Sequence, residues 1–292
     1  MESNDCIKFI DLCCGIGGFH IGLQPLQCVL ACDINKNCRI SYENNYNIIC
    51  KDDIFNLDID NIPTYNILCA GFPCQPFSQA GLKKGFSDNR SKVYFQIQSI
   101  IKKTNPDIVI LENVKNLLSL DNGNVITKIQ KDIMELDYNV NYTILNTSNF
   151  GLAQNRERVF IVCVSRKKYD NLHFNFNYLN SIKIKKCLRD TIDLDSKNYV
   201  DSNTYTIIDN QYLKPQKSGI VFCGYINDNN IDTTKNMNLS RSHKQPYRIY
   251  HINGINPTLS SGEISGRNYI YDGIGVRKLL INECLKIMGF PS

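Results

Sequence analysis

The first half of the 292-residue chain alternates short apolar runs with helix-length segments, and this alternation restricts the fold more than any other feature. The apolar runs cover residues 7–14, 28–34, 67–70, 107–114 and 158–165, and the helix-length segments cover roughly 35–47, 91–103 and 123–137. Strands that are apolar on both faces and alternate with helices are typical of a mostly parallel sheet covered by helices on both sides. We therefore expect an α/β fold in which ligands bind at the carboxyl ends of the strands.

The alternation ends near residue 186, where short strand-like runs and polar turns rich in Asn, Gly and Ser begin. Residues 279–288 have the pattern of a helix that stops before Gly289 and Pro291. The sequence therefore predicts a large domain at 1–186, a smaller irregular domain at 187–268 and a closing segment at 269–292.

Charge is distributed unevenly between the two halves. Residues 1–165 carry 15 Lys and Arg against 17 Asp and Glu, a net of −2, whereas residues 166–292 carry 18 against 11, a net of +7. A near-neutral half joined to a basic half fits a catalytic domain attached to a domain that binds a polyanion. An ordinary solvated basic surface explains the charge equally well.

Several classes of protein are disfavoured by the sequence. The apolar runs fall far short of the roughly 18 residues that span a bilayer, and the N-terminus lacks a secretory signal, so we expect neither a membrane protein nor an exported one. The thirteen cysteines include no Cys-x-x-Cys pair, and the four histidines lie far apart, so no metal site is expected. We expect reduced thiols in an intracellular, reducing compartment, which is the cytoplasm in a prokaryote.

A glycine-rich turn follows the first apolar run, in the segment Asp11-Leu12-Cys13-Cys14-Gly15-Ile16-Gly17-Gly18. Glycines at a strand end let the backbone approach a ligand closely, and Asp33 ends the next run, where a carboxylate can hold ribose hydroxyls. The dinucleotide fingerprint of dehydrogenases requires a third glycine where this chain has His20. The pattern favours a nucleoside-type cofactor, with an ordinary strand-to-helix turn as the alternative.

A cysteine between two prolines follows the third apolar run, in the segment Gly71-Phe72-Pro73-Cys74-Gln75-Pro76-Phe77-Ser78. A thiol at a strand end, with its backbone fixed by prolines, is placed to act as a nucleophile once it is ionised. This segment resembles the Pro-Cys motif of the cytosine-C5 DNA methyltransferases.

The resemblance continues in order along the chain and covers most of residues 7–165 and the last 16 residues. Glu112-Asn113-Val114 and Gln154-Asn155-Arg156-Glu157-Arg158 resemble two further motifs of the family. Arg277-Lys278-Leu279, Glu283-Cys284 and Gly289-Phe290-Pro291 resemble the segment that supports the target-recognition domain. The resemblance implies a catalytic domain of the methyltransferase fold at 1–186, a target-recognition domain at 187–268 and a truncated support segment at 269–292.

The resemblance also implies a mechanism. Cys74 adds to C6 of the target cytosine, so that C5 can attack the methyl group of S-adenosylmethionine. Glu112 donates a proton or a strong hydrogen bond to N3 of the ring. Arg158 holds O2, and Arg156 beside it fixes the site. The base has to be flipped out of double-stranded DNA to be reached. A role in a restriction–modification system follows from the same resemblance.

The resemblance also implies, from their positions in the family's motifs, which residues bind the cofactor. Those expected to bind S-adenosylmethionine are Cys13, Gly15, Ile16, Gly17, Gly18, Asp33, Ile34, Asp53, Ile54, Phe72 and Pro73. The family commonly has Phe where this chain has Cys13, so the packing of the cofactor can differ. Asp53 is alternatively part of a surface turn.

Two regions are expected to contact DNA. Glycines flank two lysines in the segment 81–90, which suits a loop that closes over the duplex and contacts phosphates. Basic residues alternate with tyrosines between 241 and 269. The expected DNA contacts are Ser78, Lys83, Lys84, Arg90, Arg241, Lys244, Arg248 and Arg267.

The main departure from the family is at the C-terminus. Family members continue past Gly-Phe-Pro, whereas this sequence stops at Ser292, as expected for a fragment, one subunit of a split enzyme or a degenerate copy. We therefore expect apolar surface near residues 7–18 to be exposed, and a second chain or a further segment to complete the fold. An inactive DNA-binding protein and a transfer RNA methyltransferase remain as alternatives, although the Cys-Phe-Thr tripeptide of the latter is absent.

Overall fold

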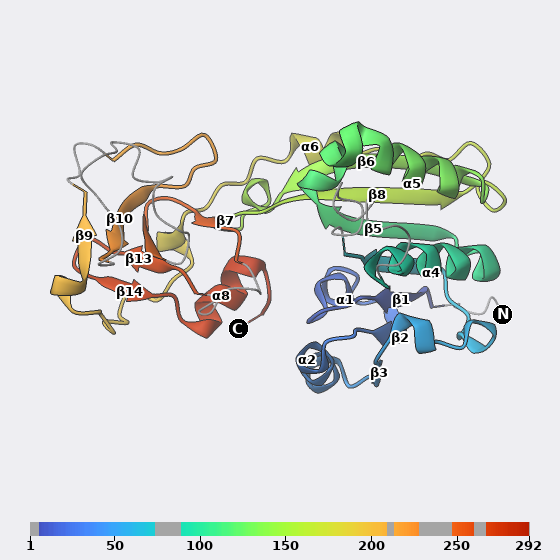
Figure 1. Cartoon of the computed structure of the whole chain (residues 1–292), viewed down its shortest axis with the longest axis horizontal. Helices are drawn as coiled ribbons and strands as arrows, with labels where there is room; N and C mark the ends of the chain where they lie inside the picture. The colour runs from blue at the N-terminus through green and yellow to red at the C-terminus, as the bar shows by residue number, and fades with distance from the viewer. Residues whose placement is uncertain (1–5, 74–88, 209–212, 228–246, 260–266, 292) are drawn as a thin grey trace. The chain divides into compact units, whose positions relative to one another are not determined.

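The computed structural model describes residues 6–73, 89–208, 213–227, 247–259 and 267–291. The chain divides into two compact units (Figure 1), one of residues 1–145 with 157–180 and one of residues 146–156 with 181–292. These boundaries differ from the expected division at residues 186 and 268. The segment 146–156 belongs to the second unit because β7 (Gln154–Asn155) pairs in parallel with β12 (Asn256–Pro257), about a hundred residues further along the chain.

A seven-stranded sheet forms the centre of the first unit, in the order β3-β2-β1-β4-β5-β8-β6 (Figure 1). Its strands are β1 (Lys8–Leu12), β2 (Gln27–Cys32), β3 (Cys50–Lys51), β4 (Ile67–Gly71), β5 (Ile108–Val114), β6 (Tyr138–Asn146) and β8 (Glu157–Ser165). The strands β3, β2, β1, β4 and β5 are joined by parallel pairings, and β8 is antiparallel to β5. The expected mostly parallel α/β fold is confirmed.

Three helices lie where the sequence predicts them, namely α2 (Lys36–Tyr46), α4 (Asn89–Thr104) and α5 (Asn124–Met134). Two short helices, α1 (Gly18–Gly22) and α6 (Asn177–Ser181), were not predicted. Local signals set the ends of α2: the Asn35 side chain accepts hydrogen bonds from the first turn of α2, and Asn47 ends that helix in the left-handed conformation. Among the described residues, no helix has the length and apolar character needed to cross a membrane.

The apolar core lies on both faces of the sheet. Helices α4 and α5 cover one face, and the buried residues of α5 recur at helical spacing, namely Val125, Ile126, Ile129 and Ile133. On the opposite face, Phe19 of α1 packs with Phe9, Ile67 and Cys69. The α2 residues Tyr42 and Tyr46 pack there with Ala31 and Cys50. Residues of β1, β2 and β4 therefore contribute to core clusters on both faces.

The expected exposure of apolar surface around residues 7–18 is wrong for most of that segment. Phe9, Ile10 and Leu12 are fully buried, because β1 is an inner strand whose two faces are covered by helices, whereas Ile7 before the strand is 48% exposed. Partly exposed apolar side chains occur instead on β5. Its residues Ile108 and Ile110 are half-buried and pack on the same face of the sheet as Phe9.

The second unit is built on a five-stranded sheet in the order β14-β13-β11-β10-β9. Its strands are β9 (Tyr205–Ile207), β10 (Phe222–Ile226), β11 (Arg248–His251), β13 (Tyr269–Tyr271) and β14 (Val276–Lys278). The closing helix α8 (Ile281–Met288) begins two residues later than expected and ends at Gly289, whose φ of 88° is left-handed. Its residues Cys284 and Ile287 pack with Ala153, Leu188 and Ile252 into one apolar cluster.

Candidate active site

Most of the predicted catalytic and cofactor residues of the first unit lie at the carboxyl edge of the sheet. The glycine turn follows β1, Asp33 follows β2, Pro73 follows β4, and Glu112 lies near the end of β5. In the registers of these strands Leu12 pairs with both Cys32 and Ala70, and Gly71 pairs with Glu112. Parallel pairing therefore brings segments that are up to a hundred residues apart to one edge, as sheets of this class require for ligand binding.

The glycine turn has a fixed backbone conformation. Positive φ angles occur at Cys13 (55°), Gly15 (54°) and Gly17 (92°). The Gly17 N–H donates to the Cys14 carbonyl at 2.9 Å, and the Cys14 N–H donates to the Cys32 carbonyl at 3.0 Å. A Cβ at Gly15 would find no atom within 4 Å, and the same holds at Gly18. The described structure thus leaves space beside the turn at both glycines, as a ligand that approaches the backbone needs.

Asp33 connects the glycine turn to the second strand. Its Oδ2 accepts the Gly15 N–H at 2.8 Å, and its Oδ1 accepts the Asn35 N–H at 2.8 Å. The guanidinium of Arg39 donates to the backbone carbonyls of Asp33 and Ile34 at 2.9 and 3.0 Å. The Ile34 side chain is 78% exposed. A carboxylate beside an exposed aliphatic side chain offers a polar and an apolar contact to a nucleoside, so these residues fit the predicted cofactor.

The other predicted cofactor residues differ in exposure. Asp53 is half-buried, and its carboxylate accepts the Phe55 N–H at 3.1 Å at the start of a short 3₁₀ turn. The side chains of Ile54 and Phe72 are 5% and 3% exposed and belong to the main core. Phe72 still contributes its backbone, whose carbonyl accepts from the Asn113 side chain at 2.8 Å. Ile54 and Phe72 therefore support the site from the core.

The described cysteines are free thiols, and many of them are buried. Burial raises the pKa of the Cys13 thiol, and it raises the pKa of Cys32 to about 12. Neither group is a thiolate at neutral pH, so neither serves as a nucleophile. Cys74 lies outside the described residues, as do Ser78, Lys83, Lys84, Arg241 and Lys244, and the side chain of Arg90 is not described.

Glu112 and Arg158 form an ion pair at the edge of the sheet, with 2.9 Å between Oε1 and Nε. Both side chains are largely shielded, with exposed fractions of 24% and 15%. The antiparallel pairing of β5 and β8 accounts for their approach, because Val114 pairs with Arg158 and Glu112 with Phe160. The structure thus brings together two predicted catalytic residues that are separated by 46 positions in the sequence.

Glu112 and Asn113 both lie against the end of β4 and the residue that follows it. A Cβ at Gly71 would lie 3.5 Å from Glu112 Oε2, an ordinary contact distance, so the carboxylate lies directly beside the backbone at the end of β4. The next residue, Asn113, is buried and binds the Phe72 carbonyl. The Glu-Asn pair is therefore anchored to the backbone that leads through Pro73 to Cys74.

Arg156 belongs to the second unit, unlike Arg158. Its backbone N–H donates to the Asn146 side chain at 3.2 Å, and its carbonyl accepts the Thr147 N–H at 3.1 Å. The motif glutamine, Gln154, is fully buried; its side chain donates to the Ile287 carbonyl and accepts the Leu259 N–H, each at 3.3 Å. Gln154 therefore fixes the motif segment to α8, a role that the sequence analysis did not assign.

The two described arginines of the expected DNA surface lie on or beside the five-stranded sheet. Arg248 begins β11 and is half-buried. Arg267 is half-buried and donates to the Leu279 carbonyl at 3.4 Å. Near it, the Lys278 ammonium lies 5.1 Å from the centre of the Tyr269 ring. Whether these side chains contact DNA stays a prediction.

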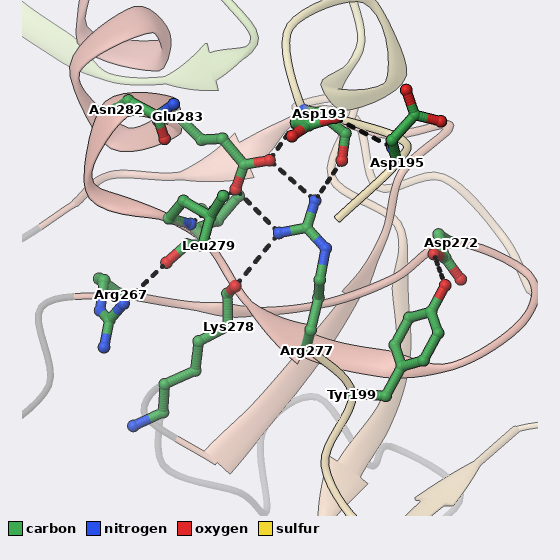
Figure 2. A network of polar contacts seen from close by, with 11 residues as sticks. Asp193, Asp195, Tyr199, Arg267, Asp272, Arg277, Lys278, Leu279, Asn282 and Glu283 are labelled. Atoms are coloured by element: carbon green, nitrogen blue, oxygen red, sulfur yellow. Dashed lines mark hydrogen bonds and ion pairs between the residues drawn. The ribbon is translucent and has the colours of Figure 1, made fainter. Parts of the chain in front are cut away.

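A buried ion pair between Arg277 and Glu283 links β14, α8 and residue Asp193 in the second unit (Figure 2). Both residues belong to motifs singled out in the sequence, but their pairing was not predicted. Arg277 donates through Nη1 and Nη2 to the two carboxylate oxygens of Glu283 at 2.9 and 2.8 Å, and Nη2 also donates to the Asp193 carbonyl at 2.8 Å. The Glu283 carboxylate accepts the backbone N–H of Leu280 at 2.6 Å and that of Asp193 at 2.8 Å. The pair therefore holds three separate segments together.

Comparison with known proteins identifies the family. A model of the family described as C-5 cytosine-specific DNA methylase matches residues 7–292. The chain is 32% identical over 294 residues to the Type II methyltransferase M.HhaI of Haemophilus parahaemolyticus, covering 98% of this chain and 84% of the relative. It is 34% identical over 303 residues to M.SsoII of Shigella sonnei, covering 100% and 73%.

Solved structures show the same fold. The Dnmt2 methyltransferase of S. pombe aligns with a TM-score of 0.65 at 17% identity, covering 98% of this chain and 87% of that one. The methyltransferase EhMeth of Entamoeba histolytica aligns with a TM-score of 0.58 at 16% identity over the same shares. The family model and the curated relatives, which span nearly the whole chain, establish that this protein belongs to the C-5 cytosine-specific DNA methylases.

Proposed function

We propose that the chain transfers a methyl group from S-adenosylmethionine to C5 of a cytosine in a specific double-stranded DNA sequence. The observation that carries the proposal is the Glu112–Arg158 ion pair at the carboxyl edge of the sheet, beside the strand that leads into Pro73-Cys74. Family membership supplies the reaction type. The relatives named above are Type II methyltransferases, which supports a role in a restriction–modification system.

The geometry of the ion pair suits the edge of a cytosine ring. N3 and O2 of cytosine are separated by a single ring carbon, so two groups that bind them must lie close together. The Glu112 carboxyl and the Arg158 guanidinium are 2.9 Å apart and largely shielded from water, where hydrogen bonds to developing charge are strengthened. Glu112 would deliver a proton or hydrogen bond to N3, and Arg158 would hold O2.

The thiol chemistry is assigned to Cys74. Addition of its thiolate to C6 forms a C–S bond and moves an electron pair towards N3, where Glu112 donates. The ring is then an enamine with a nucleophilic C5. The methyl group would come from the sulfonium of S-adenosylmethionine, which would leave as the neutral thioether S-adenosylhomocysteine, and Glu112 takes back the N3 proton. Loss of the C5 proton to a base expels the thiolate and restores the aromatic ring. Because C6 is inaccessible in a stacked base, the target nucleotide is flipped out of the duplex.

S-Adenosylmethionine would supply an electrophilic methyl group, and the residues present fit it. The glycine turn leaves open space at Gly15 and Gly18 for a close backbone approach. The Asp33 carboxylate, oriented by two backbone N–H groups, is suited to ribose hydroxyls, and the exposed Ile34 is suited to a purine face. Asp53 and the backbone of Phe72 and Pro73 complete the proposed set.

DNA binding is assigned to the second unit and to the segment 81–90. The net charge of +7 in residues 166–292 supports this, because positively charged surfaces bind the phosphate backbone and release counterions. We also propose that a further segment, in the same or a second chain, covers the half-buried Ile108 and Ile110.

Covalent trapping tests the proposal. DNA that carries 5-fluorocytosine at the target position has no C5 proton to lose, so the Cys74 adduct should persist through denaturing electrophoresis. Cys74→Ala should abolish this adduct, and Cys6→Ser, which changes an exposed cysteine, should leave it intact. An adduct of normal yield with Cys74→Ala would overturn the assignment.

The same assay separates the alternatives. Trapping of a fluorinated transfer RNA but not of DNA would identify an RNA methyltransferase. DNA binding by the wild-type chain without adduct or methyl transfer would identify a catalytically inactive DNA-binding protein. If activity appears only after a further segment is added, the chain is one part of a split enzyme.

A further inference from the structure

Three aromatic rings form a cluster behind the glycine turn, and no step of the proposed reaction uses them. His20 of α1 stacks on Tyr46 of α2, with 3.9 Å between ring centres and 14° between planes. Tyr42, one helical turn before Tyr46, meets Tyr46 edge to face at 4.7 Å and 65°. The rings therefore connect helix α1, which follows the turn, to helix α2, which follows Asp33.

Tyr46 is in direct contact with the backbone of the turn. Its hydroxyl donates to the Ile16 carbonyl at 3.1 Å and lies 3.3 Å from the Gly17 carbonyl, so the hydrogen bond is shared between them. A Cβ at Gly17 would lie 2.2 Å from Cε2 of the Tyr46 ring. The backbone of the turn thus rests against the ring at Gly17, where only glycine allows the approach.

The other rings hold Tyr46 in place. His20 Nδ1 and the Tyr42 hydroxyl are 2.8 Å apart, and the Tyr42 hydroxyl donates to Oδ2 of the fully buried Asp11 at 3.3 Å. Contacts therefore run from the centre of β1, through Tyr42 and His20, to Tyr46. Such support fixes the side-chain conformation of Tyr46 before any ligand arrives.

The two sides of the turn have different surroundings. Tyr46 packs against Ile16 and Gly17, whereas the Cβ positions of Gly15 and Gly18 are open, and the Gly15 N–H is held by Asp33. A hydrogen bond on one side and a carboxylate on the other keep the backbone in its positive-φ conformation. Without this support the turn would populate further conformations. Only the fraction in the binding-competent conformation would bind the cofactor, so the apparent affinity would fall.

We propose that Tyr46 is a positioning residue for the cofactor: its hydroxyl and ring hold the glycine turn in the conformation that S-adenosylmethionine binds. This inference rests on the assignment of the turn to the cofactor. Tyr46 itself makes no contact with the cofactor in this proposal and acts through the backbone of Ile16 and Gly17. His20, stacked on its ring, contributes by limiting the positions that the ring can take.

The test is the Tyr46→Phe variant of the full chain, which removes the hydroxyl and keeps the ring. A hydrogen bond of this kind contributes modestly to stability, so we expect the dissociation constant for S-adenosylmethionine, measured by calorimetry, to rise about three- to tenfold. Hydrogen exchange at the amides of residues 15–18 should become faster. In turnover, the KM for the cofactor should rise while kcat stays close to the wild-type value.

Tyr138→Phe is the matched control. The Tyr138 hydroxyl donates to the Pro106 carbonyl at 2.7 Å, is buried in the same unit, and lies at the start of β6 rather than at the turn. It should lower the melting temperature without changing the cofactor dissociation constant or the exchange at residues 15–18. If Tyr46→Phe left cofactor affinity at the wild-type value, or if both variants weakened binding equally, the positioning role would be wrong. If the wild-type chain bound no S-adenosylmethionine, the cofactor assignment itself would fail.

Discussion

The buried ion pair between Arg277 and Glu283 makes a prediction about the stability of the second unit. The two side chains have exposed fractions of 2% and 1%, and they form two hydrogen bonds with each other (Figure 2). Replacing Glu283 by alanine leaves a buried guanidinium whose remaining hydrogen-bond partners, among the residues that the structure describes, are the backbone carbonyls of Lys278 and Asp193. The variant therefore tests the energetic role of the network directly.

The expected cost follows from the contacts that are lost. Removing one partner of a buried ion pair costs about 3–5 kcal/mol, because the remaining charge stays buried. Glu283 also accepts the N–H groups of Leu280 and Asp193, and each buried donor left without a partner costs about 1–3 kcal/mol unless water reaches it. We expect Glu283→Ala to destabilise the second unit by about 4 kcal/mol or more, a large fraction of the stability of a typical domain.

Two controls separate the charge from the packing. Glu135→Ala changes an exposed carboxylate, 65% accessible and 3.9 Å from Lys131, and should cost less than about 0.5 kcal/mol. The double variant Arg277→Met with Glu283→Leu removes both charges together. It should be clearly more stable than Glu283→Ala, because no buried charge is left without its partner.

The assay is hydrogen exchange during urea titration, because the chain has two units and no tryptophan to report on either. The amides of β14 and α8 report on the Glu283 variants, and those of α5 report on Glu135→Ala. Affinity for S-adenosylmethionine should be unchanged, since the residues proposed to bind the cofactor belong to the first unit. If Glu283→Ala cost no more than Glu135→Ala, the reasoning about the buried pair would be refuted.

The lowered pKa of Glu283 determines how the stability of the second unit should change with pH. Burial alone would raise the pKa of Glu283, but the hydrogen bonds from Arg277, Leu280 and Asp193 outweigh burial and hold that pKa below its ordinary value of 4.5. A carboxyl group with a lowered folded-state pKa contributes stability that is present above its unfolded pKa and is lost as pH falls through the folded-state pKa. Stability of the second unit should therefore fall below about pH 4.5 in the wild type, with a smaller dependence in Glu283→Gln.

Three further predictions concern the first unit. Gly17→Ala should weaken S-adenosylmethionine binding by about tenfold or more in calorimetry, because its φ is 92° and its Cβ meets Tyr46. Gly22→Ala, at the end of α1 with open space around it and outside the proposed cofactor set, should change it little. Glu112→Gln should slow tritium transfer to DNA by about 100-fold and leave cofactor affinity unchanged, since it removes the proposed proton donor at N3. Burial raises the pKa of Asp11 well above 3.8, so wild-type stability in urea should decline as pH rises above about 4, and Asp11→Asn should lack that decline.

Much of the first unit could be predicted because its strands are apolar on both faces. The ends of the five expected strands lie within two residues of the observed ones, whereas β3 and β6 were not expected. The parallel order places Asp33, Pro73 and Glu112 at one edge, as the general rule for such sheets anticipates. The ends of helix α2 could also be predicted, since Asn35 at its N-cap and Asn47 at its C-cap are residue types that favour helix ends. Periodicity and capping act over a few residues and can be recognised in the sequence.

Long-range pairing could not be recognised in this way. The segment 146–156 joins the second unit through the pairing of Gln154 with Asn256, two residues with no local pattern in common. The Arg277–Glu283 pair joins a strand to a helix across six positions, a spacing that neither element produces by itself. The contact between Tyr46 and Gly17 likewise depends on the packing of α2 against β1 and β2. These features follow from tertiary packing, and therefore only the structure shows them.

The most direct test of the central claim is bisulfite sequencing of DNA from cells that express this chain, with the Cys74→Ala variant as the control. If the chain methylates cytosine C5 in a specific duplex sequence, protected cytosines should appear at a single position of one recurring sequence in the wild type and be absent with Cys74→Ala. The same comparison with a further C-terminal segment added shows whether that segment is required. Protection that persisted with Cys74→Ala, or its absence in every wild-type sample although the folded protein binds S-adenosylmethionine and DNA, would contradict the account.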